Sequence, residues 1–434
     1  MGIIVPLIII LFTCLIIWRA CDGFEVASEY IGRNMSEGVR GGTINAISSS
    51  IPELFTTLIA LFVLSDTEGF AIGLGTTAGS ALFNGMIIPA VCILCVVGTI
   101  VLGERVETVN VSSKVILRDG LTLIFCNVVL VVLIGGTALH WWQGLILMVI
   151  YFVYFAYMLL SMKRNDAESA EENSESDEEA SDENEDDDEP SGLIGKLFYW
   201  LSFGPLMDLE RFFVREHHKE QIAKENWNAW PLLLTSTGLI GAACWLLVVA
   251  CEWLGTGDAN TLHPNYQFLG YTLKGFGMPA IFVAVIFAAM ATSVPDTIIS
   301  IRDAKDGDYD DAVANALGSN IFDICFALGF PLFLFTILHG SIKMSPEIVL
   351  QSGEIRILLL ILTIVGFFVY FLGKRGVGSD GTKYIEMGRG KAYLLLAIYV
   401  LFVGYIVGRS QDHAWANAVA QQLQSIMNLL PKIG

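Results

Sequence analysis

The chain has 434 residues, of which 54% are hydrophobic and only 16% are charged, and its formal net charge is −19. Soluble domains carry about a quarter charged residues and lack long apolar runs, so this composition excludes an ordinary soluble domain. The acidic balance also argues against a nucleic-acid partner, which would need a basic face.

Apolar runs of roughly 20 residues, the length that crosses a bilayer, recur along the chain. They lie at residues 3–20, 40–64, 71–102, 120–137, 141–161, 231–253, 278–301, 310–338, 355–373 and 392–408. This pattern predicts an all-α polytopic membrane protein with about ten transmembrane helices and the lipid bilayer as a partner. The first run lacks a basic n-region and a cleavage site, so it is interpreted as a span rather than a signal peptide.

A polar middle segment divides the spans into two sets of five. Residues 1–161 are predicted to form a first transmembrane repeat, 162–229 a loop, 230–410 a second repeat and 411–434 a C-terminal tail. An odd number of spans in each half turns the second repeat upside down relative to the first. Inverted repeats that meet at the bilayer midplane are a recurring plan of secondary transporters.

The loop at 162–229 has two distinct parts. Asp166–Glu189 contains 15 of the 44 acidic residues and no basic one, and such a run is predicted to be disordered because it cannot bury a core. Leu193–Phe213 mixes aromatic and aliphatic residues with few charges, which predicts an amphipathic helix at the membrane interface.

Lysine and arginine are concentrated in the loops that follow odd-numbered spans. The other loops, at 65–70, 136–140, 254–277 and 339–354, hold only Lys274 and Lys343. By the positive-inside rule, the basic loops and the acidic run are predicted to be cytoplasmic. Both termini are then predicted to lie on the extracellular side of a cell membrane.

Polar motifs interrupt the spans at matching places in the two halves. Ser49–Glu53 matches Thr292–Asp296, and Gly79–Asn84 matches Gly318–Asp323. Within each motif the oxygen-bearing side chains are three or four residues apart, so they share one helical face. Ionisable residues at membrane depth are costly and are functional candidates by default. Carboxylate, hydroxyl and amide oxygens are the ligands that Ca²⁺ and Na⁺ prefer. The candidate cation ligands are Glu53, Asp296, Asp323, Asn84, Ser49, Ser50, Ser80, Thr292, Ser293 and Ser319.

The two halves differ at one candidate ligand. Glu53, Asp296 and Asp323 supply up to three negative charges, and neutral Asn84 occupies the position that matches Asp323. One Ca²⁺ neutralises two of these charges. The third carboxylate must bind a proton, a monovalent cation or a further ion, and Asp323 is the candidate for that role.

On these motifs the chain resembles the cation/calcium antiporter superfamily, which includes the sodium/calcium exchangers. The resemblance implies that Glu53 and Asp296 are the central Ca²⁺ carboxylates and that the remaining candidates complete Ca²⁺ and Na⁺ coordination. It also implies exchange of Na⁺ for Ca²⁺ by alternating access, with spans 1 and 6 sliding past a fixed core. Asp at positions 296 and 323 is similar to the potassium-dependent branch, which makes K⁺ a candidate for co-transport. No cofactor is expected; the ions that bind are the transported Ca²⁺ and Na⁺, with K⁺ as a further candidate.

Two alternatives stay open within transport. Ca²⁺/H⁺ antiport would use a protonatable Asp323, and a cation channel is the other alternative. An enzyme is not expected, because an intramembrane aspartyl protease would need a Gly-x-Gly-Asp context that neither Asp296 nor Asp323 has.

Overall fold

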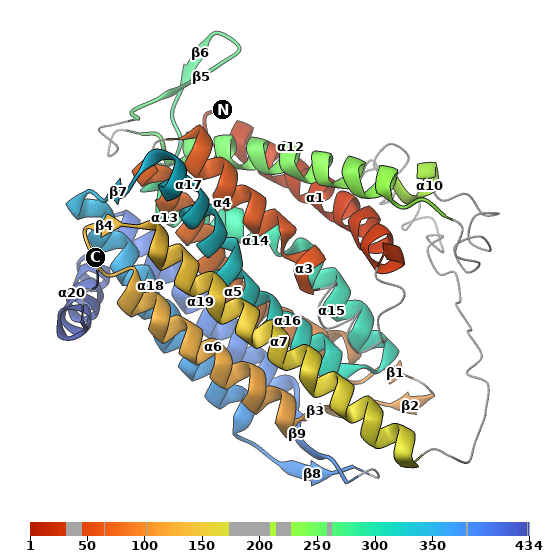
Figure 1. The fold of residues 1–434 in the computed structure, drawn as a ribbon. Coiled ribbons are helices and arrows are strands. Elements are labelled where there is room, and N and C mark those ends of the chain that lie inside the picture. Colours follow the sequence, from red (N-terminus) through yellow and green to blue (C-terminus); the bar gives the residue numbers. More distant parts are fainter. Residues whose placement is uncertain are drawn as a thin grey trace.

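Long helices lying side by side form the body of the protein in the computed structural model (Figure 1). The structure describes residues 1–31, 46–64, 66–101, 103–172, 209–213, 227–257, 263–378, 381–431 and 433. The helices of the first half are α1 (Ile4–Ile31), α3 (Ala46–Ser49), α4 (Ile51–Val63), α5 (Asp66–Val96), α6 (Ser113–Leu133) and α7 (Trp141–Glu172). Those that follow are α10 (Leu209–Phe213), α12 (Trp230–Gly255), α13 (Ala280–Val283), the π-helix η2 (Ala284–Ala288), α14 (Ala289–Thr292), α15 (Val294–Asp306), α16 (Tyr309–Phe322), the π-helix η3 (Asp323–Ala327), α17 (Gly329–His339), α18 (Pro346–Phe371), α19 (Arg389–Ser410) and α20 (Ala414–Leu429).

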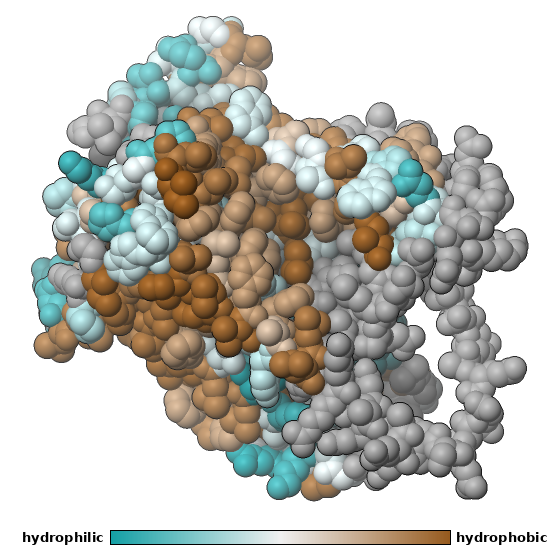
Figure 2. Space-filling view, in the orientation of Figure 1, coloured by the Kyte–Doolittle hydropathy of each residue, from teal (hydrophilic) through white to brown (hydrophobic). Residues whose placement is uncertain are grey.

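The membrane architecture agrees with the predicted all-α fold. Among the described residues, 8 helices are long and apolar enough to cross a membrane, and the bent pair formed by 280–292 and 294–306 makes a ninth. The remaining predicted span corresponds to the shorter apolar helix α4, and its first residues, 40–45, lie outside the described part of the chain. Apolar side chains form a broad belt over the face shown in Figure 2, with polar side chains toward its two ends. Lipid-facing side chains of this kind include Phe125, Val153 and Leu401, which are 56%, 65% and 73% exposed.

Each half contains a helix that is broken at its polar motif. The first break lies at Ser50 (φ −96°, ψ 4°) and the second at Ser293 (φ −82°, ψ 3°), which have nearly the same backbone conformation. Proline follows two residues later in both copies, in the first turn of α4 and of α15, where its missing N–H is tolerated. At the second break the two helix segments meet at an angle of 44°. The repeated sequence therefore produces a repeated local structure.

Short strands tie the loops together at the two ends of the bundle. At one end, β3 (Val109–Ser112) pairs with β9 (Lys383–Met387), which also pairs with β8 (Arg375–Val377). At the other end, β4 (Ala138–Leu139) pairs with β7 (Ile342–Lys343). Each of these pairings joins two loops that the charge pattern predicts to lie on the same side of the membrane. Two further pairs are two-stranded hairpins. In these, β1 (Ile100–Val101) pairs with β2 (Glu104–Arg105), and β5 (Tyr266–Phe268) pairs with β6 (Tyr271–Leu273).

Both ends of the chain lie at the end of the bundle that carries β4 and β7. Tyr266 Oη donates to Gly2 O at 2.5 Å, and Gln143 Nε2 donates to Ile433 O at 3.3 Å. The two termini thus share one end, as the loop charges predict, while the side of the membrane they face stays a prediction.

The middle segment differs from its prediction where it is described. Helix α7 continues past residue 161 to Glu172, so it includes the start of the acidic run that was predicted to be disordered. Alanine and glutamate are good helix formers and can extend a helix that a membrane span has already nucleated. Residues 173–189 of that run lie outside the described residues. Of the predicted amphipathic helix Leu193–Phe213, the structure describes only the last turn, as α10.

The segment predicted as a C-terminal tail contains helix α20, which packs on α18 and α19. Its buried residues are Ala416, Ala420, Leu423 and Met427. Glu354 of α18 makes the polar interactions at this contact. Its side chain is 0% exposed and accepts from Arg409 Nε at 3.2 Å and from Gln424 Nε2 at 3.1 Å.

Glu354→Gln is expected to destabilise the protein by about 3 kcal/mol, because it breaks a buried ion pair and leaves Arg409 without its counter-charge. Thermal unfolding of the purified protein in detergent measures the effect. Glu347→Gln, at an exposed position on the same helix, is the control and should unfold at the same temperature as the parent protein. Equal unfolding temperatures for Glu354→Gln and the parent would contradict the assigned role.

Candidate cation site

The four motifs meet in the interior of the bundle. Every one of the ten candidate ligands is at most 1% exposed. Glu53 and Asp296 each lie in the first turn of the helix that follows a break, α4 and α15. The N-terminal turn of a helix favours negative charge, which helps the interior to accept a carboxylate there.

Asp296 is held by residues of both repeats. Ser319 Oγ donates to Asp296 Oδ1 at 2.8 Å from within the same repeat. Asn84 Nδ2 donates to Asp296 Oδ2 at 2.9 Å from the other repeat. Ser49, also from the first repeat, interacts with the same carboxyl group. The carboxylate of one half is therefore positioned largely by the other half.

Glu53 has the corresponding arrangement. Ser80 Oγ donates to Glu53 Oε1 at 3.0 Å, as Ser319 does to Asp296. Thr292 of the second repeat lies near Glu53, as Ser49 of the first repeat lies near Asp296, although the Thr292 hydroxyl donates to Ala289 O at 3.2 Å. Each half thus places a hydroxyl residue near the carboxylate of the other half, as a pseudo-two-fold axis through the site requires.

The symmetry fails at Asp323. Its counterpart Asn84 donates a hydrogen bond to Asp296, whereas a carboxylate at position 323 has no hydrogen to donate to Glu53 unless it is protonated. Ser80 Oγ lies 2.9 Å from Asp323 Oδ2, 3.0 Å from Glu53 Oε1 and 2.9 Å from Ser293 Oγ. A hydroxyl has one proton, so Ser80 cannot donate to both carboxylates. Either one of the two carboxyl groups carries a proton, or a cation binds beside them.

Buried acceptor atoms also point to a cation. Glu53 Oε2, Asn84 Oδ1 and Asp323 Oδ1 have no hydrogen-bond donor among the described residues. A buried polar atom left without a partner costs roughly 1–3 kcal/mol, and a bound cation would remove that cost. No group of three or more His, Cys, Asp or Glu side chains in the described part of the chain is spaced to hold a metal ion. The unpartnered Asn84 Oδ1 and the serine hydroxyls beside the two carboxylates are further oxygen atoms that could coordinate a cation.

The sequence interpretation missed Asn320. Its Nδ2 donates to Ala81 O at 3.0 Å and joins α16 to α5. Ala81 is the residue that matches Asn320 in the repeat, so this bond links the two copies of one position. The signal was present in the sequence, because Asn320 directly follows Ser319 where the first motif has alanine.

Glycines of α5 let that helix approach the second repeat closely. A Cβ at Gly75 would lie 2.6 Å from Ile281 O, and one at Gly79 would lie 2.2 Å from Val285 O. Both carbonyls belong to the stretch from α13 to η2. Since Gly79 precedes Ser80, this close packing fixes where the Ser80 hydroxyl lies.

Gly79→Ala is expected to reduce the yield of folded protein or abolish function, because its methyl group would overlap backbone atoms. The measurement is the fraction of protein that elutes as a single species in size-exclusion chromatography. Gly404→Ala is the control, since no described atom lies within 4 Å of its added Cβ. Equal behaviour of the two variants would show that the α5 contact tolerates a methyl group.

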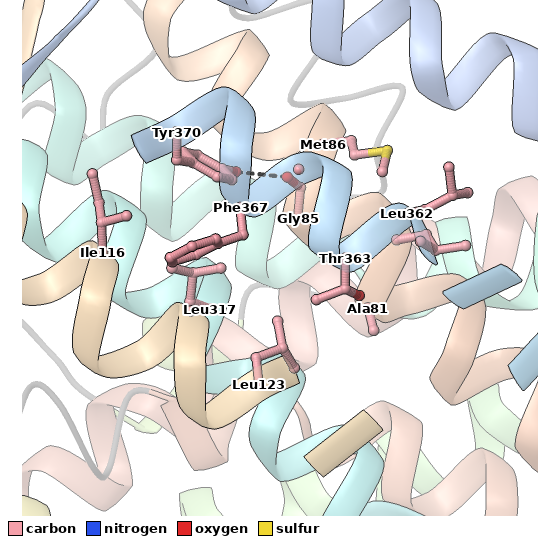
Figure 3. Close-up of a pocket in the computed structure, with 13 residues that line it drawn as sticks. Ala81, Gly85, Met86, Ile116, Leu123, Leu317, Leu362, Thr363, Phe367 and Tyr370 are labelled. Carbon is pink, nitrogen blue, oxygen red and sulfur yellow. Dashed lines mark hydrogen bonds between the residues drawn. The ribbon is translucent and has the colours of Figure 1, made fainter. Parts of the chain in front are cut away.

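Other cavities in the described part of the chain lie apart from this cluster. A small apolar one of about 20 Å³, shown in Figure 3, is lined by Gly85, Thr363, Phe367 and Tyr370, with Tyr370 Oη donating to Gly85 O at 2.6 Å. None of its lining residues is a carboxylate or one of the ten candidate ligands. A larger cavity of about 160 Å³, near β7, has Glu68, Glu252, Glu347 and His263 in its lining.

Comparison with known proteins gives a consistent result. The family model described as "Sodium/calcium exchanger protein" matches residues 5–160 and 228–408. The chain is 26% identical to human sodium/potassium/calcium exchanger 5 over 382 residues, covering 78% of this chain and 72% of that protein. It is 38% identical to mouse sodium/potassium/calcium exchanger 3 over 141 residues, but that match covers 32% of this chain and only 20% of the relative. A solved structure of the sodium-calcium exchanger NCX_Mj, soaked with Na⁺ and Sr²⁺, has a TM-score of 0.46 and 19% identity over 93% of this chain and 98% of its own. Because the family model matches most of the chain in two segments that coincide with the two repeats, the protein belongs to the sodium/calcium exchanger protein family.

Proposed function

We propose that this protein is a secondary active antiporter that exchanges Ca²⁺ for Na⁺ across a cell membrane by alternating access. K⁺ is a candidate for co-transport, since the relatives named above are sodium/potassium/calcium exchangers. In this proposal both termini face outward and the acidic loop faces the cytoplasm. Glu53 and Asp296 are the central ligands of Ca²⁺, and Asp323 and Asn84 adjust which other ions bind.

The observation that carries the proposal is the direct hydrogen bonding between polar residues of the two repeats. Asn84 of the first repeat bonds Asp296 of the second at 2.9 Å, and Ser80 of the first bonds Asp323 of the second at 2.9 Å. A site built this way changes its geometry whenever one repeat moves against the other. Alternating access uses such a movement to release an ion on one side and bind one on the other.

Proteoliposomes loaded with Na⁺ test the proposal. Ca²⁺ uptake should follow an outward Na⁺ gradient and stop when Na⁺ is equal on both sides, with external K⁺ varied separately. Uptake that follows a pH gradient and ignores Na⁺ would refute the coupling ion. Single-channel currents far above carrier rates would refute antiport and favour a cation channel.

Ca²⁺/H⁺ antiport is the second candidate, and the environment of Ser80 favours it. Because one hydroxyl proton is shared by two carboxyl groups at 3.0 Å and 2.9 Å, a proton on Glu53 or Asp323 would satisfy the cluster when no cation is bound. Release of that proton on Ca²⁺ binding would couple the two ions. The same proteoliposomes distinguish the candidates. Only Ca²⁺/H⁺ antiport predicts that, without Na⁺, the vesicle interior becomes alkaline in proportion to Ca²⁺ uptake.

A further inference from the structure

A cavity of about 160 Å³ lies at the end of the bundle that carries β4, β7 and both chain termini (Figure 1). Its lining includes Ser345 and Glu347, which follow β7 in the chain and are exposed, so the cavity reaches the surface. The lining also includes Ile72 of α5 and Ile281 of α13, which are each 1% exposed. The cavity therefore leads from the surface into the bundle between the two repeats.

The inner end of the cavity lies about two helical turns from the candidate cation site. Ile72 precedes Ser80 by eight residues on α5, which is about 12 Å along the helix axis. Between them, a Cβ added to Gly75 would lie 2.6 Å from Ile281 O, so α5 and α13 touch there. The cavity thus ends at a closed contact, and separation of α5 from α13 would extend it toward the candidate ligands.

Acidic side chains are the majority of the titratable groups that line the cavity. Glu68 lies on α5, Glu252 on α12 and Glu347 on α18, and His263 follows α12 in the chain. Helix α13 contributes no titratable side chain, and no lysine or arginine is among the described lining residues. A cavity lined by charges of one sign concentrates ions of the opposite sign and speeds their entry. This lining therefore suits a cation.

His263 can offset part of this negative charge. Its Nε2 lies 3.2 Å from Glu68 Oε2, and the two side chains are 42% and 23% exposed, so water reaches both. Histidine ordinarily gains its proton between about pH 8 and pH 5, and a protonated His263 would form an ion pair with Glu68. The lining then carries one more unit of positive charge at acidic pH than at alkaline pH, even if no carboxylate changes.

We propose that the cavity is the entry vestibule for the transported cation and that His263 sets the rate of entry. Neutral His263 leaves the negative lining to attract the ion, whereas protonated His263 repels it. This role rests on the proposed function, which supplies Ca²⁺ as the ion. One unit charge about 8 Å from a divalent ion in a water-like medium changes its rate of entry about fivefold, and that of a monovalent ion about twofold. Entry of Ca²⁺ should therefore slow at acidic pH more than entry of Na⁺.

Ca²⁺ uptake into oriented proteoliposomes tests the role of His263. The full-length protein is reconstituted at less than one chain per vesicle, and vesicles with outward-facing termini are captured through an N-terminal tag. With internal pH and Na⁺ held constant, uptake at Ca²⁺ far below saturation should fall about fivefold between external pH values of about 8 and about 5.5. The maximal rate at saturating Ca²⁺ should stay the same. Added choline chloride should reduce the pH effect, because salt screens the charge.

Variants of the lining assign the effect to one side chain. His263→Gln should keep the parent's uptake at about pH 8 and lose the pH dependence, whereas His263→Arg should take up Ca²⁺ slowly at both pH values. His339→Gln changes an exposed histidine that does not line the cavity, so it is the control and should behave like the parent. A pH dependence that persists in His263→Gln would overturn the proposal, as would one that only Glu252→Gln abolishes.

The electric potential in the cavity can also be measured without transport. Ser345→Cys places a thiol in the lining, and Cys95→Ala removes an exposed native thiol. The rates of modification by a cationic and an anionic methanethiosulfonate reagent are compared, and their ratio cancels the ionisation of the thiol. From about pH 8 to about pH 5.5 the cation-to-anion ratio should fall about fivefold with His263 present and stay constant in His263→Gln.

The two readouts separate failure of this proposal from failure of the proposed function. A modification ratio that ignores pH with His263 present would overturn the proposal. A ratio that changes as expected, together with Ca²⁺ uptake that does not depend on His263, would show that the ion enters elsewhere and would also overturn it. Absence of Ca²⁺ uptake under every gradient would refute the proposed function, and with it the role of the cavity in Ca²⁺ entry, while the ratio would still report the charge on His263.

Discussion

Glu53→Gln and Asp296→Asn are each expected to lower Ca²⁺ affinity by about a hundredfold or more, which would abolish transport at ordinary Ca²⁺ concentrations. Each change removes a full negative charge from an interior site while keeping nearly the same shape. Because the two carboxylates occupy matching positions and are held by matching serines at 3.0 Å and 2.8 Å, we expect similar losses from both.

Ca²⁺ flux into proteoliposomes, at equal amounts of reconstituted protein, measures this effect. Thr57→Val is the control, because Thr57 Oγ1 donates to Glu53 O at 2.9 Å and so bonds only its own helix in this contact. Its flux should stay near that of the parent. Normal flux in Glu53→Gln and Asp296→Asn would remove both residues from the cation site.

Asp323→Asn is expected to change the dependence on monovalent ions more than the affinity for Ca²⁺. The introduced amide could donate to Glu53 as Asn84 donates to Asp296 at 2.9 Å, which would make the two halves chemically alike. No proton or monovalent cation would then be needed beside Ser80. The half-maximal concentration of the responsible ion, Na⁺, K⁺ or H⁺, should shift by about tenfold or the dependence should disappear.

Flux measured over separate Na⁺, K⁺ and pH series identifies that ion. The reciprocal variant Asn84→Asp, which adds a carboxylate at the matching position, is the comparison and should strengthen rather than remove a monovalent requirement. Unchanged Na⁺, K⁺ and pH profiles for Asp323→Asn would contradict the role assigned to the asymmetry.

Much of the fold follows from local sequence. Hydropathy identifies the long spans because a bilayer requires about 20 apolar residues, whatever the neighbouring helices are. The two helix breaks follow from Pro52 and Pro295, which lack an N–H and clash with the preceding turn, so the preceding helix cannot continue through them. The candidate ligands could be identified because the same polar motifs recur at equal spacing in apolar spans of both halves, which indicates a shared function.

Other features depend on contacts that sequence alone does not reveal. Helix α20 contains no charged residue between Ala414 and Leu429, and its sequence alone suggested a polar tail. Its place in the bundle depends on the bond from Gln424 to Glu354, which is itself paired with Arg409. The π-helix η3 begins at Asp323, whereas the matching Asn84 lies inside the continuous helix α5. π-Helical turns often occur at functional sites, but their position depends on tertiary packing.

Equilibrium binding of radioactive Ca²⁺ to the purified protein tests the central claim that both repeats build one site. One Ca²⁺ should bind per chain, Na⁺ should compete for it, and Glu53→Gln and Asp296→Asn should each abolish it completely. Two Ca²⁺ per chain, or half of the binding retained in either variant, would show that each repeat carries its own site and would contradict the account.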